Sequence, residues 1–318
     1  MQPKLSILIP THDRSDVLAQ TLESLRAVRV PAGADVELVV VANACTDRTE
    51  AVVAEAAPSM PLPTRCVAEP TVGLNAARNR CVREAAGGIL AMLDDDVWVE
   101  PGWLEGLLHV YETRPAQLVG GKVTLWWQAV QRPQWMSDPV EELLTRKDHG
   151  GEVKELSAGH DAVGANFSFR REVYDALGGF TAGLDRTGKS LLAAGEYDFI
   201  SRALGNGFRL FYAPGAAVRH WVAPHRVGDA YLGGVAYGTG MSQVFMKPRF
   251  GPAEVARQLA GRSWLIARYG LPEAWAKLRG DRREMMRNRV FRKIGTGGLA
   301  GTVKRLAGRS PVVRPGGV

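Results

Sequence analysis

Short apolar runs rich in branched residues alternate with segments of helical periodicity through the first 93 residues, and this alternation limits the possible folds most. Between the runs at 5–9 and 36–41, residues 17–28 place Leu18, Leu22 and Leu25 on one helical face. A second unit of the same order follows, with predicted strands at 65–68 and 89–93 and a predicted helix at 75–86. Two strand–helix–strand units in series predict a parallel sheet covered by helices on both faces.

Residues 94–225 are predicted to add further strands and helices to the same sheet, and residues beyond 226 are predicted to be mainly helical. We expect helices after Pro101, up to Gly178 and over 197–204, with strands over 119–125, 165–169 and 208–212. Residues 126–160 contain Trp126, Trp127 and Trp135 among polar residues and are typical of an insertion over an active site. Beyond residue 226 we expect helices over 252–269 and 273–293, and a loose Gly- and Pro-rich end over 295–318. The predicted domains are therefore 1–225 and a basic, mainly helical extension, 226–318.

Charge and cysteine content narrow the class of protein. The three cysteines form no Cys-x-x-Cys pair, and no apolar stretch is long enough for a signal peptide or a membrane span, so we expect a soluble protein of the cytoplasm. Residues 247–318 carry 17 Lys and Arg against four Asp and Glu, whereas residues 1–246 carry 23 against 29. This basic region could be a solvated helical face, or it could contact anionic lipid on the inner face of a membrane or an anionic acceptor. No nucleic acid partner is expected.

An acidic triplet, Asp94-Asp95-Asp96, directly follows the fourth predicted strand. Its carboxylates are therefore expected at the carboxyl edge of the sheet, where open α/β folds bind ligands. Adjacent carboxylates repel one another, and a hard divalent cation that also bridges two phosphates relieves that repulsion. Solvated turn acids are the alternative explanation of such a triplet taken alone.

Five separated segments, in the expected order, resemble the family 2 glycosyltransferases over roughly residues 4–225. The segments are Leu5-Ser-Ile-Leu-Ile-Pro-Thr-His-Asp-Arg14, Val40-Val-Ala-Asn-Ala-Cys-Thr-Asp47, Gly73-Leu-Asn-Ala-Ala-Arg-Asn79, Asp94-Asp-Asp96, and Gly195-Glu-Tyr-Asp198 with the strand that ends at His220. The resemblance implies a GT-A fold, in which helices sandwich a Rossmann-like mixed sheet. It also implies transfer of a sugar, with inversion at the anomeric carbon, from a nucleotide-diphosphate sugar to an acceptor hydroxyl. UDP-sugars are the favoured donors, and Mn²⁺ or Mg²⁺ is the expected cofactor.

Within that resemblance, site roles fall on named residues. Glu196 or Asp198 is the expected catalytic base, and Asp94, Asp96 and His220 are the expected metal ligands. The expected donor-binding residues are Pro10, Thr11, His12, Arg14, Asn43, Arg78, Asp94 and Asp95. The acceptor is expected to be a carbohydrate, a lipid-linked molecule or a small molecule of glycoconjugate biosynthesis.

Two departures from the family pattern bear on specificity and mechanism. Ala42 stands where the family commonly has an Asp that contacts the nucleoside, and Glu196 stands where it has Asp. Two other functions remain as alternatives, a nucleotidyltransferase and a catalytically silent sugar- or nucleotide-binding module. The first would want a glycine-rich loop after the first strand, which Pro10–Arg14 does not supply, and the second has no need of a base such as Glu196.

Overall fold

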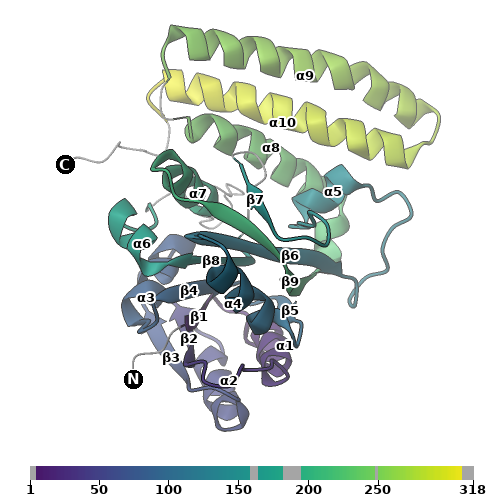
Figure 1. The fold of residues 1–318 in the computed structure, drawn as a ribbon. Helices are drawn as coiled ribbons and strands as arrows, with labels where there is room; N and C mark the ends of the chain where they lie inside the picture. The colour runs from purple at the N-terminus through teal and green to yellow at the C-terminus, as the bar shows by residue number, and fades with distance from the viewer. Residues whose placement is uncertain (1–4, 158–163, 182–194, 248–249, 310–318) are drawn as a thin grey trace. The chain divides into compact units, whose positions relative to one another are not determined.

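The computed structural model describes residues 5–157, 164–181, 195–247 and 250–309 (Figure 1). Their strands are β1 (Leu5–Thr11), β2 (Val36–Asn43), β3 (Thr64–Glu69), β4 (Ile89–Leu93), β5 (Val97–Val99), β6 (Leu118–Trp126), β7 (Lys154–Leu156), β8 (Asn166–Arg170) and β9 (Leu210–Trp221). The helices are α1 (Ser15–Arg26), α2 (Thr49–Ala56), α3 (Leu74–Glu84), α4 (Trp103–Thr113), α5 (Asp138–Leu143), α6 (Arg171–Leu177), α7 (Gly195–Gly205), α8 (Asp229–Phe245), α9 (Pro252–Leu278) and α10 (Arg282–Leu306), with short 3₁₀ turns at Ala57–Ser59 and Pro224–Val227.

The described residues divide into two compact units, which we treat separately. The first contains those up to Trp126, those of 145–181 and those of 196–221; the second contains 127–144, Gly195 and those from Val222 onward. The predicted boundary between functional domains, after residue 225, stays a prediction.

The first unit is built on one mixed sheet in the order β3-β2-β1-β4-β8-β6-β9-β5, with β7 paired to β9. Strands β3, β2, β1 and β4 are mutually parallel, as the repeated strand–helix–strand pattern predicts, whereas β8 runs antiparallel to both β4 and β6. The sheet is therefore parallel where the sequence pattern is regular and mixed beyond it.

Alternate residues of the central strands face two separate cores. Leu5, Ile7 and Ile9 of β1 pack with apolar side chains of α1, α2 and α4, while Leu8 packs with those of α3, α6 and α7. Because successive strand side chains point to opposite faces, a strand covered on both sides is mostly apolar. All seven residues of β1 are buried, and its two polar side chains, Ser6 and Thr11, are hydrogen-bonded to Glu37 and Asp95.

Strand β9 is longer than the predicted strand over 208–212. Its pairing with β6 shifts register between Gly121 and Lys122, where the partner residue changes from Ala213 to Ala217. The residues skipped include Pro214, which cannot donate a backbone hydrogen bond and is therefore accommodated in a bulge. The strand resumes after the bulge and carries His220 to its far end.

The second unit contains α5 and three long C-terminal helices, of which α10 packs along both α8 and α9 (Figure 1). Two expectations for this region are wrong. Helix α9 continues through Pro272 and stops before Gly280, whose φ of 71° suits a left-handed helix end. Residues 295–306 are helical rather than loose; residues 310–318 lie outside the described part of the chain.

The glycines that suggested a loose end are contact points between helices. A Cβ added to Gly297 of α10 would lie 1.9 Å from the Tyr237 carbonyl oxygen of α8, and one added to Gly240 of α8 would lie 2.0 Å from that of Ile294. Only glycine permits so close a backbone approach. Among the described residues, no helix combines the length and apolar character needed to cross a membrane.

Candidate active site

The acidic triplet forms the turn between β4, which ends at Leu93, and β5, which begins at Val97. Val97 pairs with His220 of β9, and the Trp221 amide donates to the Asp96 carbonyl oxygen at 2.8 Å. The pairing of β5 with β9 therefore brings His220, 124 positions further along the chain, to the carboxyl end of β4. Nothing in the sequence spacing of the two segments indicates this contact.

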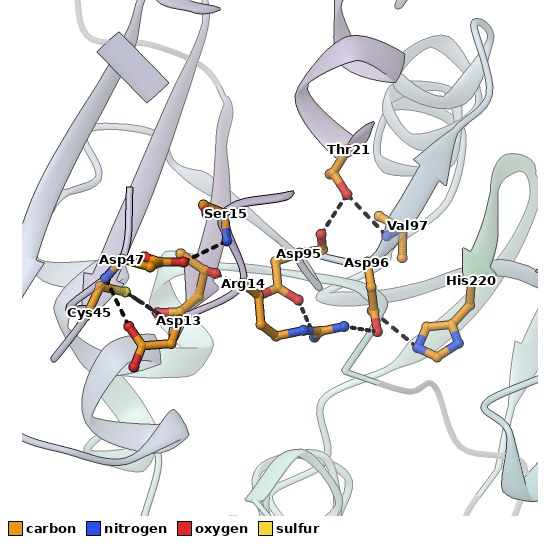
Figure 2. A network of polar contacts seen from close by, with 11 residues as sticks. Asp13, Arg14, Ser15, Thr21, Cys45, Asp47, Asp95, Asp96, Val97 and His220 are labelled. Carbon is orange, nitrogen blue, oxygen red and sulfur yellow. Dashed lines mark hydrogen bonds and ion pairs between the residues drawn. The ribbon is translucent and has the colours of Figure 1, made fainter. Parts of the chain in front are cut away.

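Asp95 is fixed by residues of the β1–α1 segment (Figure 2). Its carboxylate accepts hydrogen bonds from the Thr11 hydroxyl at 2.6 Å and from Arg14 at 2.5 Å, and the Thr21 hydroxyl donates to its carbonyl oxygen at 2.7 Å. Arg14 also donates to Asp96 Oδ2 at 2.8 Å. One guanidinium thus holds two members of the triplet.

The triplet is crowded, and Asp95 and Asp96 are buried while Asp94 is half-buried. Burial raises the pKa of Asp95 to about 7; Arg14 opposes this change, and Asp96 adds to it. Burial and the neighbouring Asp96 also raise the pKa of Asp94, against the pull of Arg78 and His220. Concentrated negative charge of this kind, in the turn between β4 and β5, marks a place where a cation would be stabilised.

Asp94, Asp96 and His220 each offer a ligand atom, and these atoms all lie within 4.8 Å of one another. His220 Nε2 lies 3.2 Å from Asp96 Oδ1, on the side of the carboxylate opposite Arg14 (Figure 2). Two carboxylates and one imidazole form a donor set that suits Mn²⁺ or Mg²⁺. The three residues expected as metal ligands are therefore brought together.

Glu196, near the start of α7, lies beside this group. Its Oε2 is 3.2 Å from Nη1 of Arg78, a side chain that is 3% exposed, and its charge acts on Asp94. Gly164 lines the same place, since a Cβ there would lie 2.5 Å from Arg78 and 3.4 Å from Glu196. Any larger residue at 164 would displace this ion pair.

Asp198, the other candidate base, is engaged in holding the fold. Its Oδ2 accepts hydrogen bonds from the Thr181 hydroxyl at 2.8 Å and from Arg202 at 2.9 Å. The Arg202 guanidinium also donates hydrogen bonds to the carbonyl oxygens of Leu177 and Gly179. Asp198 therefore ties α7 to the segment after α6, whereas Glu196 pairs with Arg78 and its charge acts on Asp94 of the acidic triplet.

The loops after β1 and β2 are bound to each other by two carboxylates. Asp13, at φ 47°, accepts hydrogen bonds from the amide and hydroxyl of Thr46, and Asp47 accepts from the first amides of both α1 and α2, at Ser15 and Thr49. Although burial opposes it, hydrogen bonding from Thr49 and Ser15 lowers the pKa of Asp47 to about 2. One side chain thus caps two helices at the carboxyl edge of β1 and β2.

His12 and Asn43 also lie at this edge. His12 Nδ1 donates to the Asn43 carbonyl oxygen at 2.6 Å, which leaves the Nε2 side of the exposed ring for other partners. The Asn43 amide donates to the carbonyl oxygens of Glu69 and Thr71 and accepts from the Gly73 amide. Asn43 therefore shapes the edge by joining the ends of β2 and β3 to the start of α3.

A comparison of the sequence with protein families identifies the family to which this chain belongs. The profile of glycosyl transferase family 2 matches residues 6–178, more than half of the chain. The chain belongs to glycosyltransferase family 2.

Curated relatives of this glycosyltransferase are themselves glycosyltransferases or polysaccharide biosynthesis proteins. It is 27% identical over 233 residues to the glucosyl-dolichyl phosphate glucuronosyltransferase of Haloferax volcanii, with 72% of each chain covered. It is 30% identical over 230 residues to the succinoglycan biosynthesis protein ExoM of Rhizobium meliloti, covering 72% of this chain and 70% of the relative. The chain is thus an enzyme of the glycosyltransferase class.

Solved structures agree on the fold. The mannosyltransferase PcManGT of Pyrobaculum calidifontis, in complex with GDP-Man and Mn²⁺, superposes with a TM-score of 0.62 at 19% identity over 96% of this chain and 88% of that one. Residues 1–349 of S. aureus TarS in complex with UDP superpose with a TM-score of 0.54 at 16% identity, covering 99% and 94%. The glycosyltransferase has the GT-A fold that its sequence motifs indicate.

Sequence reasoning missed several residues that build the site. Thr21 and Asp47 position the triplet and the two loops, and Gly164 leaves space for Arg78 and Glu196. Asp47 lies within one of the resembling segments and just before α2, a helix that was not predicted from the sequence, so capping chemistry could have indicated both. Thr21 and Gly164 carry no comparable signal.

Proposed function

We propose that this glycosyltransferase is an inverting, metal-dependent enzyme that transfers a sugar from a UDP-sugar to an acceptor hydroxyl. The observation that supports this most is the grouping of Asp94, Asp96 and His220 within 4.8 Å beside Glu196. A cation site and a basic carboxylate at one sheet edge are the two chemical parts that metal-dependent transfer of this kind requires.

The residues present fit a divalent cation. Asp94 and Asp96 are like charges in a buried turn, and His220 adds an imidazole that binds metals in its neutral form. When bound, the cation would neutralise charge on the departing diphosphate. The Mn²⁺ in the mannosyltransferase complex named above supports the same choice of metal.

The donor is proposed to lie along the edge formed by the loops after β1 and β2. His12 can stack on the base or, as the imidazolium, donate to a phosphate through Nε2. The hydrogen bonds of Thr11 and Arg14 to the buried Asp95 hold the edge rigid beneath it. Arg14 uses its guanidinium on Asp95 and Asp96, so we assign it the role of positioning the triplet. We propose that Pro10, Asn43 and Arg78 contribute to donor binding indirectly, by fixing the shape of the protein surface against which the donor lies.

Glu196 is proposed to accept the proton of the acceptor hydroxyl as that oxygen attacks the anomeric carbon. Arg78 holds the carboxylate toward the triplet, where the reacting carbon of a bound donor would be. A direct displacement with one base inverts the anomeric configuration, whereas retention by two displacements would need a second carboxylate as nucleophile. Asp198, bonded to Thr181 and Arg202, does not fill that role.

UDP is favoured by the TarS complex, and the mannosyltransferase complex makes GDP the alternative. The relatives named for glucosyl-dolichyl phosphate and succinoglycan support an acceptor of glycoconjugate or polysaccharide synthesis, such as a lipid-linked sugar. A cytoplasmic location also stays a prediction.

The test is a transfer assay on the full chain with UDP- and GDP-sugars, each with and without Mn²⁺. We expect UDP release only with Mn²⁺ and one class of donor, and a product whose anomeric configuration, read by NMR, is opposite to that of the donor. Activity undiminished by chelation, or a product with retained configuration, would show that the proposed mechanism is wrong.

A further inference from the structure

One side of α9 exposes large apolar side chains in a regular line. Trp264, Leu271, Trp275 and Leu278 are 60%, 81%, 59% and 80% exposed, respectively. Their spacing of seven, four and three residues places them within about 60° of arc on a helix of 3.6 residues per turn. They therefore form a single apolar stripe, which we call the α9 stripe.

The opposite side of α9 is occupied. Glu273 accepts hydrogen bonds from Arg289 and Arg292 of α10, and Tyr269 stacks on Phe291 with ring centroids 4.8 Å apart. Within the second unit, α10 lies against both α8 and α9, so the helix is anchored on one side only (Figure 1). The stripe is thus a permanent feature of a well-packed helix.

Arginines accompany the stripe at regular intervals. Arg257, Arg268 and Arg279 recur every eleven residues, about three helical turns, and follow one edge of the stripe. Arg279 lies over the Trp275 ring at 5.7 Å, so charge and apolar surface meet directly. The two acidic side chains of α9, Glu254 and Glu273, are only 12% and 10% exposed. Glu254 pairs with Arg257, and Glu284 of α10 pairs with Arg279, whereas the ion pairs of the described residues include none for Arg268. With four basic residues against two acidic ones, α9 keeps a net positive charge.

We propose that the α9 stripe and its arginines bind the surface of an anionic lipid bilayer, with α9 lying in the plane of the interface. Tryptophan and leucine enter the boundary between headgroups and acyl chains, while arginines of the same helix pair with lipid phosphates. The cationic character disfavours the other occupant, a second copy of the chain, because pairing two such faces brings arginines toward arginines. The inference is independent of the donor and of the catalytic base.

The test is flotation of the full chain with vesicles. With about 30 mol% phosphatidylglycerol in phosphatidylcholine, we expect a partition coefficient at least about tenfold above that for pure phosphatidylcholine, and a fall when salt rises from about 0.1 to about 0.5 M. Replacing both tryptophans, as Trp264→Ser with Trp275→Ser, should lower binding about tenfold or more. Arg268→Gln should lower binding to anionic vesicles and leave binding to neutral ones unchanged.

A matched control is Leu259→Ser. Leu259 is an exposed apolar residue of the same helix, about 140° around the axis from Trp264, so its loss should leave vesicle binding unchanged. Transfer to a water-soluble acceptor should persist in all three variants, which separates loss of membrane binding from loss of folding or activity. Equal binding of wild type to neutral and anionic vesicles, or a dimer in solution that Trp264→Ser dissociates, would overturn the proposal.

Discussion

Two carboxylates separated by one residue have different environments in this enzyme. Glu196 pairs with Arg78 beside the acidic triplet, whereas Asp198 accepts hydrogen bonds from Thr181 and Arg202. We predict that Glu196→Gln lowers kcat by about 10²-fold or more with little change in donor affinity or melting temperature, because the amide cannot accept the proton. Steady-state kinetics and thermal melts measure both effects.

Asp198→Asn is the comparison. It keeps the shape of the side chain but weakens the charge-assisted bond to Arg202, so we expect a lower melting temperature and a smaller loss of kcat. The assignment of the base would be reversed if Asp198→Asn abolished turnover in a stably folded protein while Glu196→Gln did not.

Most candidate residues of the site could be identified from the sequence, whereas the side chains that each of them contacts mostly could not. Asp94–Asp96 follow an apolar strand, so their place at the sheet edge could be predicted from pattern alone. Arg14 was expected to face a nucleotide, but it binds Asp95 and Asp96, since two buried carboxylates nearby are stronger partners than solvent. Spacing along the chain could not distinguish Glu196 from Asp198, because that depends on Thr181 and Arg78 in space.

At the level of elements, Asp47 holds the first amides of α1 and α2 together. Its pKa is lowered to about 2, so its carboxylate contributes stability that is full above the unfolded pKa of about 4 and is lost as the pH falls toward about 2. We predict that the difference in melting temperature between wild type and Asp47→Ala is constant from about pH 5 to 7 and shrinks below about pH 4. A difference that grew on acidification would contradict the capping role.

Helices α8 and α10 meet at glycines, so substitution of these glycines is predicted to destabilise the helix packing. Gly297→Ala should destabilise the protein by about 1–3 kcal/mol, because its Cβ would lie 1.9 Å from the Tyr237 oxygen. Gly261→Ala is the control: no atom lies within 4 Å of its Cβ and it is inside α9, so it should stabilise by about 0.5–1 kcal/mol. Urea unfolding measures both changes, and equal effects of the two substitutions would refute the close packing.

The same glycines explain where element prediction failed. Strands β1 to β4 were predicted well, since β1, β2 and β4 are buried along their length and are mostly apolar. The C-terminal part of α10 was expected to be loose because Gly295, Gly297, Gly298 and Gly301 are poor helix formers taken singly. Tertiary contact at these positions outweighs that propensity, and contact is not visible in the sequence.

For the whole molecule, the motifs of residues 6–178 carry the family and the fold, and the C-terminal helices lie outside them. Site motifs at a sheet edge can be recognised from their order and spacing along the chain. The role of an added helical unit depends instead on which of its faces stay exposed, and the sequence does not show this. The α9 stripe is such a face. Its leucines and tryptophans could equally have been core residues until the packing of α9 on α10 was known.

The central claim is that Asp94, Asp96 and His220 hold a divalent cation through which a nucleoside diphosphate binds. The most direct test is calorimetric titration of UDP into the full chain, with and without Mn²⁺, for wild type and for Asp96→Ala. We predict that Mn²⁺ tightens UDP binding to the wild type by at least about tenfold and has no effect on the variant. Equal UDP affinity with and without Mn²⁺ in the wild type, or a Mn²⁺ effect that survives in folded Asp96→Ala, would contradict the account.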